Sequence, residues 1–176
     1  MGNSIHKAKA TSYNKIKNAT EEDAEQISNI RVKARKEGYK GIISEKYLDT
    51  LTSSTERIQS YKNIIRMNAN IFLVSERDGL IKGFIYGGEP RDRDEISSKE
   101  VYAFYVNPEC QREGIGSQLF NEFCKKIRPR DVYLRTLSGS KGDAFYQKRG
   151  GIASGTKKIE IGGDIYKEIK YVFKTD

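Results

Sequence analysis

The sequence predicts an α/β (α+β) fold in which a mixed, mostly antiparallel central sheet is flanked by helices on both faces. Short apolar runs such as Ile71–Val74 and Val101–Val106 have the length of strands and alternate with segments of helical periodicity. The turn signal Asp78-Gly79 joins two neighbouring strands as a hairpin, which requires an antiparallel pair. Later in the chain a strand, a helix and the strand Asp131–Leu137 form a β–α–β unit, which places helices over a partly parallel sheet.

The length of the chain predicts one domain with a short arm. A chain of 176 residues is long enough to bury a core of its own and suits one domain. Residues 1–11 are polar and carry lysines, which is typical of a flexible terminal arm. We therefore expect residues 12–176 to form a single domain.

Two capping boxes predict helices in the first part of the chain. After a short strand at Tyr13–Lys17, the run Thr20–Asp23 places a capping hydroxyl before acidic residues, and Gly38 is suited to end the helix. A second capping box begins the helix Ser53–Met67. The segment Tyr39–Leu48 connects the two helices, and its tyrosines are candidates for packing or for contact with a substrate.

Strands dominate the rest of the chain. A short helix is expected between Ser138 and Gly150, behind a flexible entry. The remaining expected strands are Ile71–Val74 with Ile81–Tyr86, Val101–Val106, Asp131–Leu137, and the final hairpin Thr156–Ile161 with Ile165–Phe173. The polar loop Gly87–Glu95 is too charged to be buried.

Composition excludes some classes of protein and leaves others open. No apolar run approaches the ~20 residues of a membrane span, so no membrane partner is expected. The cysteines Cys110 and Cys124 cannot make a disulfide framework, which favours a reduced, cytoplasmic location. With one histidine the chain offers too few ligands for a zinc site, so no metal is expected. The net charge of +8 fits a solvated basic surface, an anionic cofactor or nucleic acid, but no block of basic residues favours the last.

The stretch Glu100–Ser117 carries the strongest functional signal. An apolar strand ends at Asn107-Pro108, and the helix Ser117–Ile127 follows a turn that contains Gly114 and Gly116. A strand, a glycine turn and a helix together direct free backbone N–H groups toward an anion. The turn does not fit the Rossmann pattern, whose third glycine would fall on Leu119, nor the P-loop, which needs Gly-Lys-Ser/Thr.

The turn does fit the pattern Q/R-x-x-G-x-G/A, and with its strand and helix it resembles the cofactor motif of the GNAT superfamily of acyl-CoA-dependent N-acetyltransferases. The predicted order of elements is similar to the GNAT fold from about Tyr13 to Phe173. The resemblance implies acetyl-CoA as co-substrate. It also implies binding of the acetyl and pantetheine parts by the backbone of Phe104, Tyr105 and Val106. The pyrophosphate is assigned to the turn residues Arg112, Glu113, Gly114, Ile115, Gly116 and Ser117.

A second GNAT motif is matched in part. The aromatic pair Phe145-Tyr146 is present, and Tyr146 is the candidate general acid for the departing thiolate because a phenol is protonated at neutral pH. Gly139 and Gly142 stand where the family has asparagine and alanine, and Gly151 where it has phenylalanine. The missing side chains put one cofactor hydrogen bond in doubt, and we expect the first two glycines to loosen the start of the helix.

The candidate general base is Glu100, which opens the central strand where several GNAT members carry a catalytic glutamate. A solvated acid at the end of a strand is an equal reading of Glu100, and Glu89 is the reserve candidate. The resemblance also allows an acceptor that is drawn in already deprotonated, with ordered water only, so the expected activity does not require a dedicated base. Cys110 precedes the turn, but the sequence places no base beside it, so an acyl relay through this thiol is not expected.

We therefore expect an N-acetyltransferase that moves the acetyl group from acetyl-CoA to a primary amine by direct attack in a ternary complex. A small-molecule acceptor is favoured over a peptide terminus or a lysine side chain. The alternatives are a non-catalytic CoA-binding module of the same fold and a basic nucleic-acid-binding domain. The edge of the final hairpin leaves a homodimer open.

Overall fold

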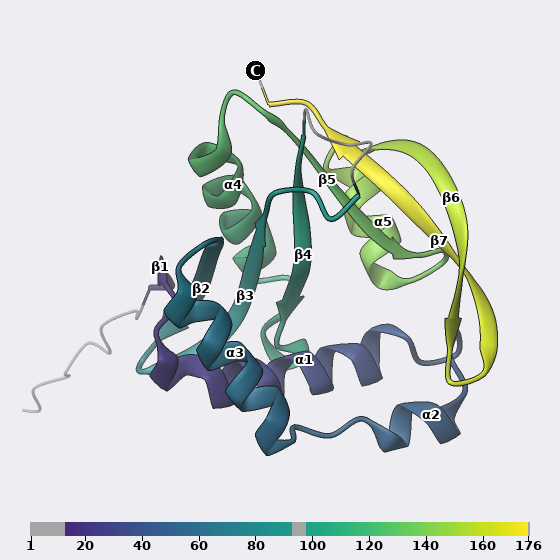
Figure 1. The fold of residues 1–176 in the computed structure, drawn as a ribbon, viewed down its shortest axis with the longest axis horizontal. Helices are drawn as coiled ribbons and strands as arrows, with labels where there is room; N and C mark the ends of the chain where they lie inside the picture. The colour runs from purple at the N-terminus through teal and green to yellow at the C-terminus, as the bar shows by residue number, and fades with distance from the viewer. Residues whose placement is uncertain (1–12, 93–97, 176) are drawn as a thin grey trace, which may run out of the picture.

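A computed structural model shows a seven-stranded sheet with helices on both faces (Figure 1). It describes residues 13–92 and 98–175, so the expected arm at 1–11 and the end of the charged loop lie outside the described residues. The strands are β1 (Lys15–Asn18), β2 (Ile71–Arg77), β3 (Leu80–Gly88), β4 (Ser98–Val106), β5 (Asp131–Leu137), β6 (Ile152–Ile161) and β7 (Asp164–Phe173). The helices are α1 (Ala24–Gly38), α2 (Glu45–Thr50), α3 (Thr55–Met67), α4 (Ile115–Ile127) and α5 (Lys141–Lys148), with short 3₁₀ turns at Glu21–Asp23 and Pro108–Cys110.

The sheet has the strand order β1-β2-β3-β4-β5-β7-β6, and every neighbouring pair is antiparallel except β4 and β5. That exception follows from the β–α–β connection through α4, because a crossover helix returns the chain in the same direction. The parallel pairing is short: it joins Ser98–Glu100 to Asp131–Tyr133 and goes no further. Beyond those residues β4 and β5 separate, which opens the middle of the sheet.

The two faces of the sheet carry separate hydrophobic cores. On one face α4 packs its apolar residues Leu119 and Phe123, both fully buried, against Leu73 and Ile85 of the central strands. On the other face α1 and α3 pack Ile27 and neighbouring side chains against aromatic residues of β2 and β3. Helical residues spaced three or four apart make such a stripe, so the sequence pattern itself accounts for both layers.

A third cluster ties the segment after α1 to the tip of the final hairpin. Ile43 and Leu48 are buried against Leu137 at the end of β5. Gly162, at the β6–β7 turn, lies against the ring of Tyr47, where a Cβ atom would come within 2.6 Å of Tyr47 Cδ2. Figure 1 shows α2 beside this turn, so the connection between α1 and α3 closes one side of the central opening.

The predicted fold class and the predicted order of the strands along the chain are confirmed. The capping box at Thr20 is present, although it begins a 3₁₀ turn. The second capping box, predicted at Ser53–Glu56, is not formed: the N-cap of α3 is Ser54, whose hydroxyl accepts from the Arg57 N–H. The sequence missed the six-residue helix α2, which is too short to show a period. It also placed the start of the penultimate strand at Thr156, whereas β6 starts at Ile152 with an irregularity between Ala153 and Thr156.

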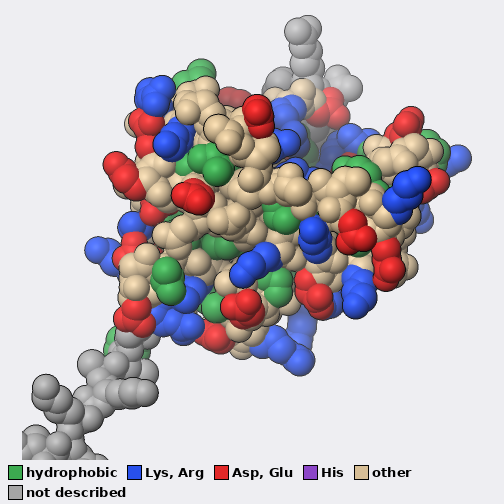
Figure 2. All heavy atoms as spheres, turned by 90° about the horizontal axis from the view of Figure 1, so that it is seen from below, with side chains coloured by type: hydrophobic (Ala, Val, Ile, Leu, Met, Phe, Trp, Pro, Cys, Tyr) green, Lys and Arg blue, Asp and Glu red, His purple; other side chains and the backbone are tan. Residues whose placement is uncertain are grey.

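Within the described residues, no helix has both the length and the hydrophobicity needed to cross a bilayer. Figure 2 views the molecule from the side of α1 and α2, and there Lys and Arg side chains alternate with Asp and Glu. The positive charge therefore forms no continuous stripe on this face.

Candidate active site

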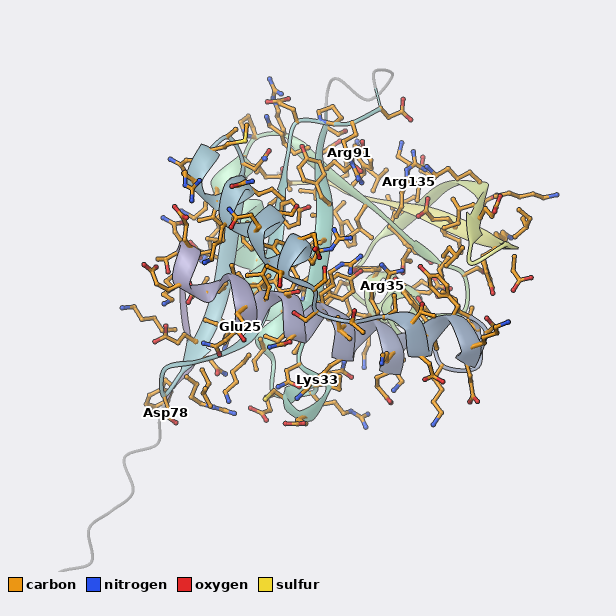
Figure 3. All side chains as sticks on the ribbon, turned by 60° about the horizontal axis from the view of Figure 1, so that its bottom comes forward. Glu25, Lys33, Arg35, Asp78, Arg91 and Arg135 are labelled. Carbon is orange, nitrogen blue, oxygen red and sulfur yellow. The ribbon has the colours of Figure 1, made fainter. Side chains whose placement is uncertain are left out.

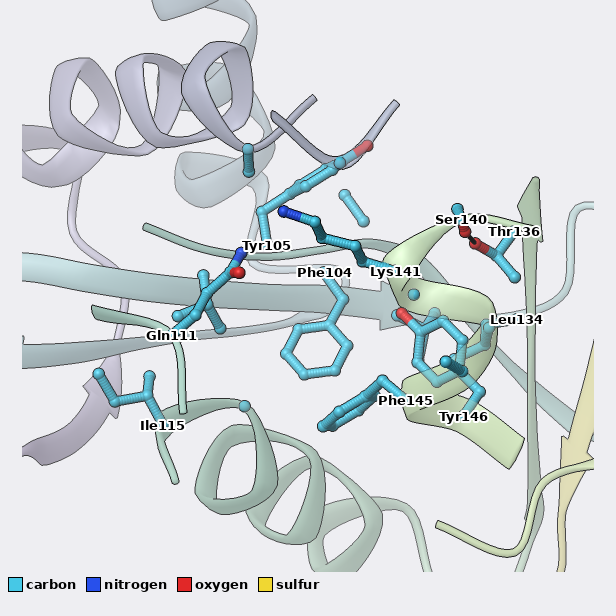
Figure 4. A pocket seen from close by; sticks show the side chains of 18 of the residues that line it. Phe104, Tyr105, Gln111, Ile115, Leu134, Thr136, Ser140, Lys141, Phe145 and Tyr146 are labelled. Carbon is cyan, nitrogen blue, oxygen red and sulfur yellow. Dashed lines mark hydrogen bonds between the residues drawn. The ribbon is translucent and has the colours of Figure 1, made fainter. Parts of the chain in front are cut away.

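A pocket of about 780 Å³ occupies the opening between β4 and β5 (Figure 4). Its walls come from five parts of the chain, between Ala34 and Lys148. The lining residues are Ala34, Gly38 and Tyr39 near the end of α1, Val101–Val106 of β4, Cys110–Arg112 and Gly114–Ser117 of the turn and α4, Leu134–Thr136 of β5, and Ser140–Gly142, Ala144–Tyr146 and Lys148 at α5.

The edge of β4 that faces β5 is unpaired along the pocket. Residues Gly83–Gly88 of β3 pair with β4 on its other edge as far as Val106, whereas β5 pairs only as far as Glu100. Backbone N–H and C=O groups on an unpaired strand edge are free to bind an extended polar chain. Phe104, Tyr105 and Val106, predicted to bind the pantetheine part, all lie on this edge and line the pocket.

The turn before α4 has the backbone shape of an anion site. Arg112 and Gly114 both have positive φ, at 69° and 81°. Gly114 is the N-cap of α4, and no side chain caps this helix, whereas Ser44, Ser54 and Ser140 cap α2, α3 and α5. The first N–H groups of α4 therefore lack the partner that a capping side chain supplies, and the positive end of the helix dipole points at the same place.

The predicted pyrophosphate residues all line the pocket except Glu113. Glu113 is turned to Arg77 of β2, whose Nη1 donates to its carboxylate at 2.7 Å. Gly116 has room for a side chain, since a Cβ atom would meet Phe145 at 3.5 Å and Phe104 at 3.6 Å, which are ordinary contacts. The glycine that the backbone requires is therefore Gly114, whose positive φ other residues adopt only with strain.

Tyr146 lies on α5 and is buried at the wall of the pocket. Its ring packs among aromatic neighbours, with centroids 5.4 Å from Phe145 and 6.3 Å from Phe104. Figure 4 shows its hydroxyl directed toward the pocket. Burial raises the pKa of the Tyr146 phenol, and the nearby Tyr105 raises it further. The hydroxyl is therefore a proton donor throughout the neutral range.

The start of α5 is well held, against the expectation that glycines would loosen it. The Ser140 hydroxyl accepts from the Asp143 N–H at 3.1 Å, and the Asp143 carboxylate accepts from the Gly139 N–H at 2.9 Å. The Tyr171 hydroxyl of β7 donates to the same carboxylate. Gly142 fits closely against Thr136, whose Oγ1 would lie 3.1 Å from an added Cβ. The lack of a side chain at Gly142 therefore allows α5 to pack closely against β5.

Packing also explains why residue 151 is a glycine. A Cβ atom at this position would come within 2.8 Å of Phe173 Cζ and 2.9 Å of the Tyr146 carbonyl oxygen. The Phe173 ring on β7 thus fills the space beside Gly151, in a chain that lacks the phenylalanine usual at that position.

Glu100 does not line the pocket, although it stands at the end of the β4–β5 pairing. Its carboxylate accepts from Arg91 Nε at 3.0 Å, from the Arg91 N–H at 2.8 Å and from the Tyr133 hydroxyl at 3.0 Å. Burial alone would raise the pKa of Glu100, but these donors outweigh it and the net shift is downward. A hydrogen-bonded carboxylate of lowered pKa is a poor acceptor for a further proton. Glu89 is also ion-paired, with Lys99.

The structure places at the pocket several residues that the sequence did not single out. Lys141 lines it and donates to Glu37 of α1 at 2.6 Å, which joins α1 to α5 across 104 positions of sequence. Arg135 lines it from β5, and Figure 3 shows its place in the molecule. No local motif marks these residues, because each belongs to an ordinary helix or strand pattern.

Tyr39, from the segment considered as a substrate wall, does reach the pocket. Burial raises the pKa of its phenol, and interaction with the Tyr105 hydroxyl raises it further. Tyr39, Tyr105 and Tyr146 thus bring three tyrosine side chains to the lining of the pocket. Among residues 13–92 and 98–175, no group of three His, Cys, Asp or Glu side chains is placed to hold a metal ion.

Comparison with known proteins agrees with this geometry. The family model for the acetyltransferase (GNAT) domain matches residues 68–150, which contain β2 to β5, the turn and α5. An uncharacterized N-acetyltransferase, YuaI of Bacillus subtilis (strain 168), is 26% identical over 157 residues, which cover 88% of this chain and 89% of the relative.

Solved structures also match over nearly the whole chain. The PaiA N-acetyltransferase of Thermoplasma acidophilum, in complex with coenzyme A, is 25% identical with a TM-score of 0.66, and the match covers 90% of this chain and 99% of that one. The acetyltransferase yncA of Salmonella typhimurium, described as putative and solved with acetyl-CoA, has a TM-score of 0.67 at 16% identity, covering 93% of this chain and 94% of that one. At 16% identity, the similarity to yncA shows a shared fold only.

Proposed function

Since this chain belongs to the GNAT superfamily and is an acyl-CoA-dependent N-acetyltransferase, we propose that it transfers the acetyl group of acetyl-CoA directly to a primary amine of a small molecule. Both substrates are bound together in the pocket between β4 and β5. The cofactor end is the turn before α4, and the acceptor end lies toward α1.

One observation carries the proposal: an unpaired strand edge and an uncapped helix N-terminus open into the same pocket. The pantetheine part of coenzyme A has amides that pair with a free strand edge, and its pyrophosphate suits N–H groups at a helix start. We assign the first role to the backbone of Phe104, Tyr105 and Val106. The second falls to the turn residues Arg112, Gly114, Ile115, Gly116 and Ser117, with Glu113 contributing through its backbone.

Proton balance sets the requirements of the reaction. A lysine-like amine has a pKa of about 10.4 and must lose a proton before its lone pair can attack the thioester carbon. Attack forms the C–N bond, and the nitrogen then gives up a second proton. The C–S bond breaks as the departing sulfur takes up one proton from a donor, which the second proton of the nitrogen restores, so that an amide and a thiol are formed. We propose that the Tyr146 hydroxyl donates to that sulfur, because it faces the pocket and burial keeps it protonated.

Direct attack is favoured over an acyl-enzyme. Cys110, the cysteine that lines the pocket, is buried within the hydrophobic cluster beside the turn, at the phosphate end of the site. For the base, the predicted role of Glu100 stays a prediction, and its contacts favour a supporting role in which it holds Arg91 and Tyr133. We therefore propose that water in the pocket carries the proton away from the amine.

The proposal is tested by two measurements on the purified chain. Calorimetric titration with acetyl-CoA should show one site per chain, and release of free thiol should depend on an added amine. Thiol release with small amines but not with peptides or proteins supports the small-molecule acceptor. Binding without thiol release for any amine, peptide or protein would contradict the catalytic proposal and leave a module that only binds coenzyme A.

A further inference from the structure

The final hairpin ends the sheet in a long free edge. β6 is the last strand in the order and has ten residues, and Figure 1 shows it on the side of the molecule opposite β1. β1 ends the other side of the sheet with only four residues. All β6 residues from Ile152 to Lys158 are exposed. A long exposed edge strand offers a row of backbone N–H and C=O groups to a further strand, whereas a short one offers few.

The part of β6 that is regular enough to accept another strand lies near the tip of the hairpin. An irregularity between Ala153 and Thr156 interrupts the pairing of β6 with β7. Irregularities of this kind bend a strand and protect an edge from pairing. From Thr156 to Ile161 the register with β7 is continuous. Any further strand is therefore expected along this outer part.

The two faces of the outer part differ in chemistry. Ile159 and Ile161 are partly buried in the hydrophobic cluster that includes Leu48 of α2. Because side chains alternate between the faces of a strand, Lys158 and Glu160 point to the opposite face, and both are exposed there. One face of the edge is thus apolar, and the other carries one positive and one negative charge.

The hairpin alone leaves the charges of the polar face unmatched. In the register of β6 with β7, Lys158 lies directly opposite Lys167, and Glu160 lies opposite an apolar residue. Like charges directly opposite each other destabilise a sheet. On the other face, by contrast, Lys157 has an acid across the hairpin, since its Nζ lies 3.5 Å from the carboxylate of Glu168.

A second copy of the chain supplies the missing partners in one register. Two antiparallel copies of one strand, side by side, are related by a two-fold axis perpendicular to the sheet. With that axis at Ile159, Lys158 of each copy lies opposite the other copy's Glu160, and both side chains share one face. Moving the axis by one residue places Lys158 opposite Lys158, or Glu160 opposite Glu160, which is repulsive.

We propose that the chain forms a homodimer in which the β6 strands of two copies pair antiparallel, centred on Ile159. The sheet then continues across the axis into the sheet of the second copy. Two ion pairs between Lys158 and Glu160 form on the polar face, and the Ile159 side chains meet on the other, where they extend the cluster beside α2. The described lining of the pocket includes no residue of β6 or β7, so the dimer is independent of the proposed acetyl transfer.

Sedimentation of the full chain over a range of concentrations tests the proposal. The wild type should have twice the chain mass of 20.0 kDa and dissociate on dilution. Lys158→Glu should weaken the dimer by about 10- to 100-fold, because two attractive pairs become two repulsive ones. Lys15→Glu is the matched control, since it makes the same change of charge on β1 at the opposite edge of the sheet, and it should leave the dimer unchanged.

Mixing two variants tests the register itself. Lys158→Glu and Glu160→Lys each place like charges across the axis, so each alone should be monomeric at concentrations where the wild type is a dimer. An equimolar mixture should form a heterodimer, because the carboxylates of the first variant then face the ammonium groups of the second. Titration with acetyl-CoA shows that each variant is folded, and each should bind it as the wild type does.

Three outcomes overturn the proposal. The first is a wild-type chain that stays at 20.0 kDa at every concentration. The second is a dimer that Lys158→Glu does not weaken, which would form through another surface. The third is a mixture that stays monomeric, which would exclude the register centred on Ile159. Thiol release is measured on the same samples, so a failure of the dimer is distinguished from a failure of the proposed function.

Discussion

The two ends of the pocket are built in different ways. The cofactor end consists of one continuous stretch, β4 followed by the turn and the start of α4, and it presents mainly backbone groups. The acceptor end brings together α1, β4, β5 and α5, and it presents side chains such as Tyr39, Arg135 and Lys141. Backbone groups are suited to the parts that every acyl-CoA shares, whereas side chains can change without disturbing the sheet.

This difference separates what the family has in common from what is particular to this chain. A strand that diverges from its neighbour and a helix with no capping side chain belong to the backbone of the fold, whereas the acceptor end depends on individual side chains. The following changes test this division, starting with the one expected to have the largest effect.

Gly114→Glu should abolish binding of acetyl-CoA. The variant places a carboxylate at the helix N-terminus, where it competes with the pyrophosphate, and it forces a φ of 81° on a residue with a side chain. We expect the affinity to fall by more than about 1000-fold, or some 4 kcal/mol, measured by calorimetry.

Gly79→Glu is the matched control for this change. Gly79 has a similar φ of 74° and open space around it, but it lies in the β2–β3 turn, away from the pocket. It should bind acetyl-CoA as the wild type does. Equal binding by the Gly114 variant would remove the turn from the cofactor site.

Tyr146→Phe should lower kcat by about 100-fold with no change in the affinity for acetyl-CoA, since a positioned proton donor contributes about 10²–10⁴. Steady-state kinetics with a small amine gives kcat, and Tyr166→Phe on the exposed hairpin is the control. Because burial raises the pKa of Tyr146 above its ordinary value of 10.0, the donor stays protonated as the pH rises through neutrality. The pH profiles of kcat for the wild type and the Phe variant should therefore have the same shape up to about pH 9, with no additional decrease in the wild type.

Glu100→Gln should reduce stability by about 2 kcal/mol at pH 7, because it removes charge-assisted hydrogen bonds from a buried carboxylate. The folded pKa of Glu100 is lowered, so its contribution is present above the unfolded value of about 4.3 and is lost as the pH falls through the folded value. Denaturant unfolding should therefore show a smaller difference in the free energy of unfolding between the wild type and the variant at pH 3 than at pH 7.

The same variant tests the predicted base. If Glu100 only supports Arg91 and Tyr133, kcat of the variant should match the wild type at neutral pH, where the amine still has to lose its proton, and its pH profile should be unchanged. A fall in kcat at neutral pH that is recovered at high pH, where the amine is already deprotonated, would restore Glu100 as the base. Glu160→Gln on the exposed strand β6 controls for loss of a charge.

Lys141→Met should have the smallest effect on stability, within about 0.5 kcal/mol, because the ion pair with Glu37 is exposed on both sides. Urea unfolding measures this, with Lys174→Met, which removes another surface pair, as the reference. A loss of several kcal/mol would mean that the link between α1 and α5 holds the pocket together.

Much of the cofactor end was predictable because it is local. The apolar strand, the Asn107-Pro108 stop, the turn glycine Gly114 and the amphipathic helix α4 each follow from neighbouring residues. The prediction that the glycines at 139 and 142 would loosen α5 was wrong because its support comes from elsewhere: Asp143 is held by Tyr171, 28 positions later, as well as by its own helix start.

The sequence by itself determined the fold class, the order of the strands along the chain and the glycine turn before α4, because hydrophobic period, caps and glycines act over a few residues. Only the tertiary structure decided which side chains meet at the acceptor end. Tyr39, Tyr105, Arg135 and Lys141 come together because β4 and β5 separate after Glu100 and because the end of α1 lies at that opening. Such long-range contacts depend on the packing of the whole sheet, and no local pattern encodes them.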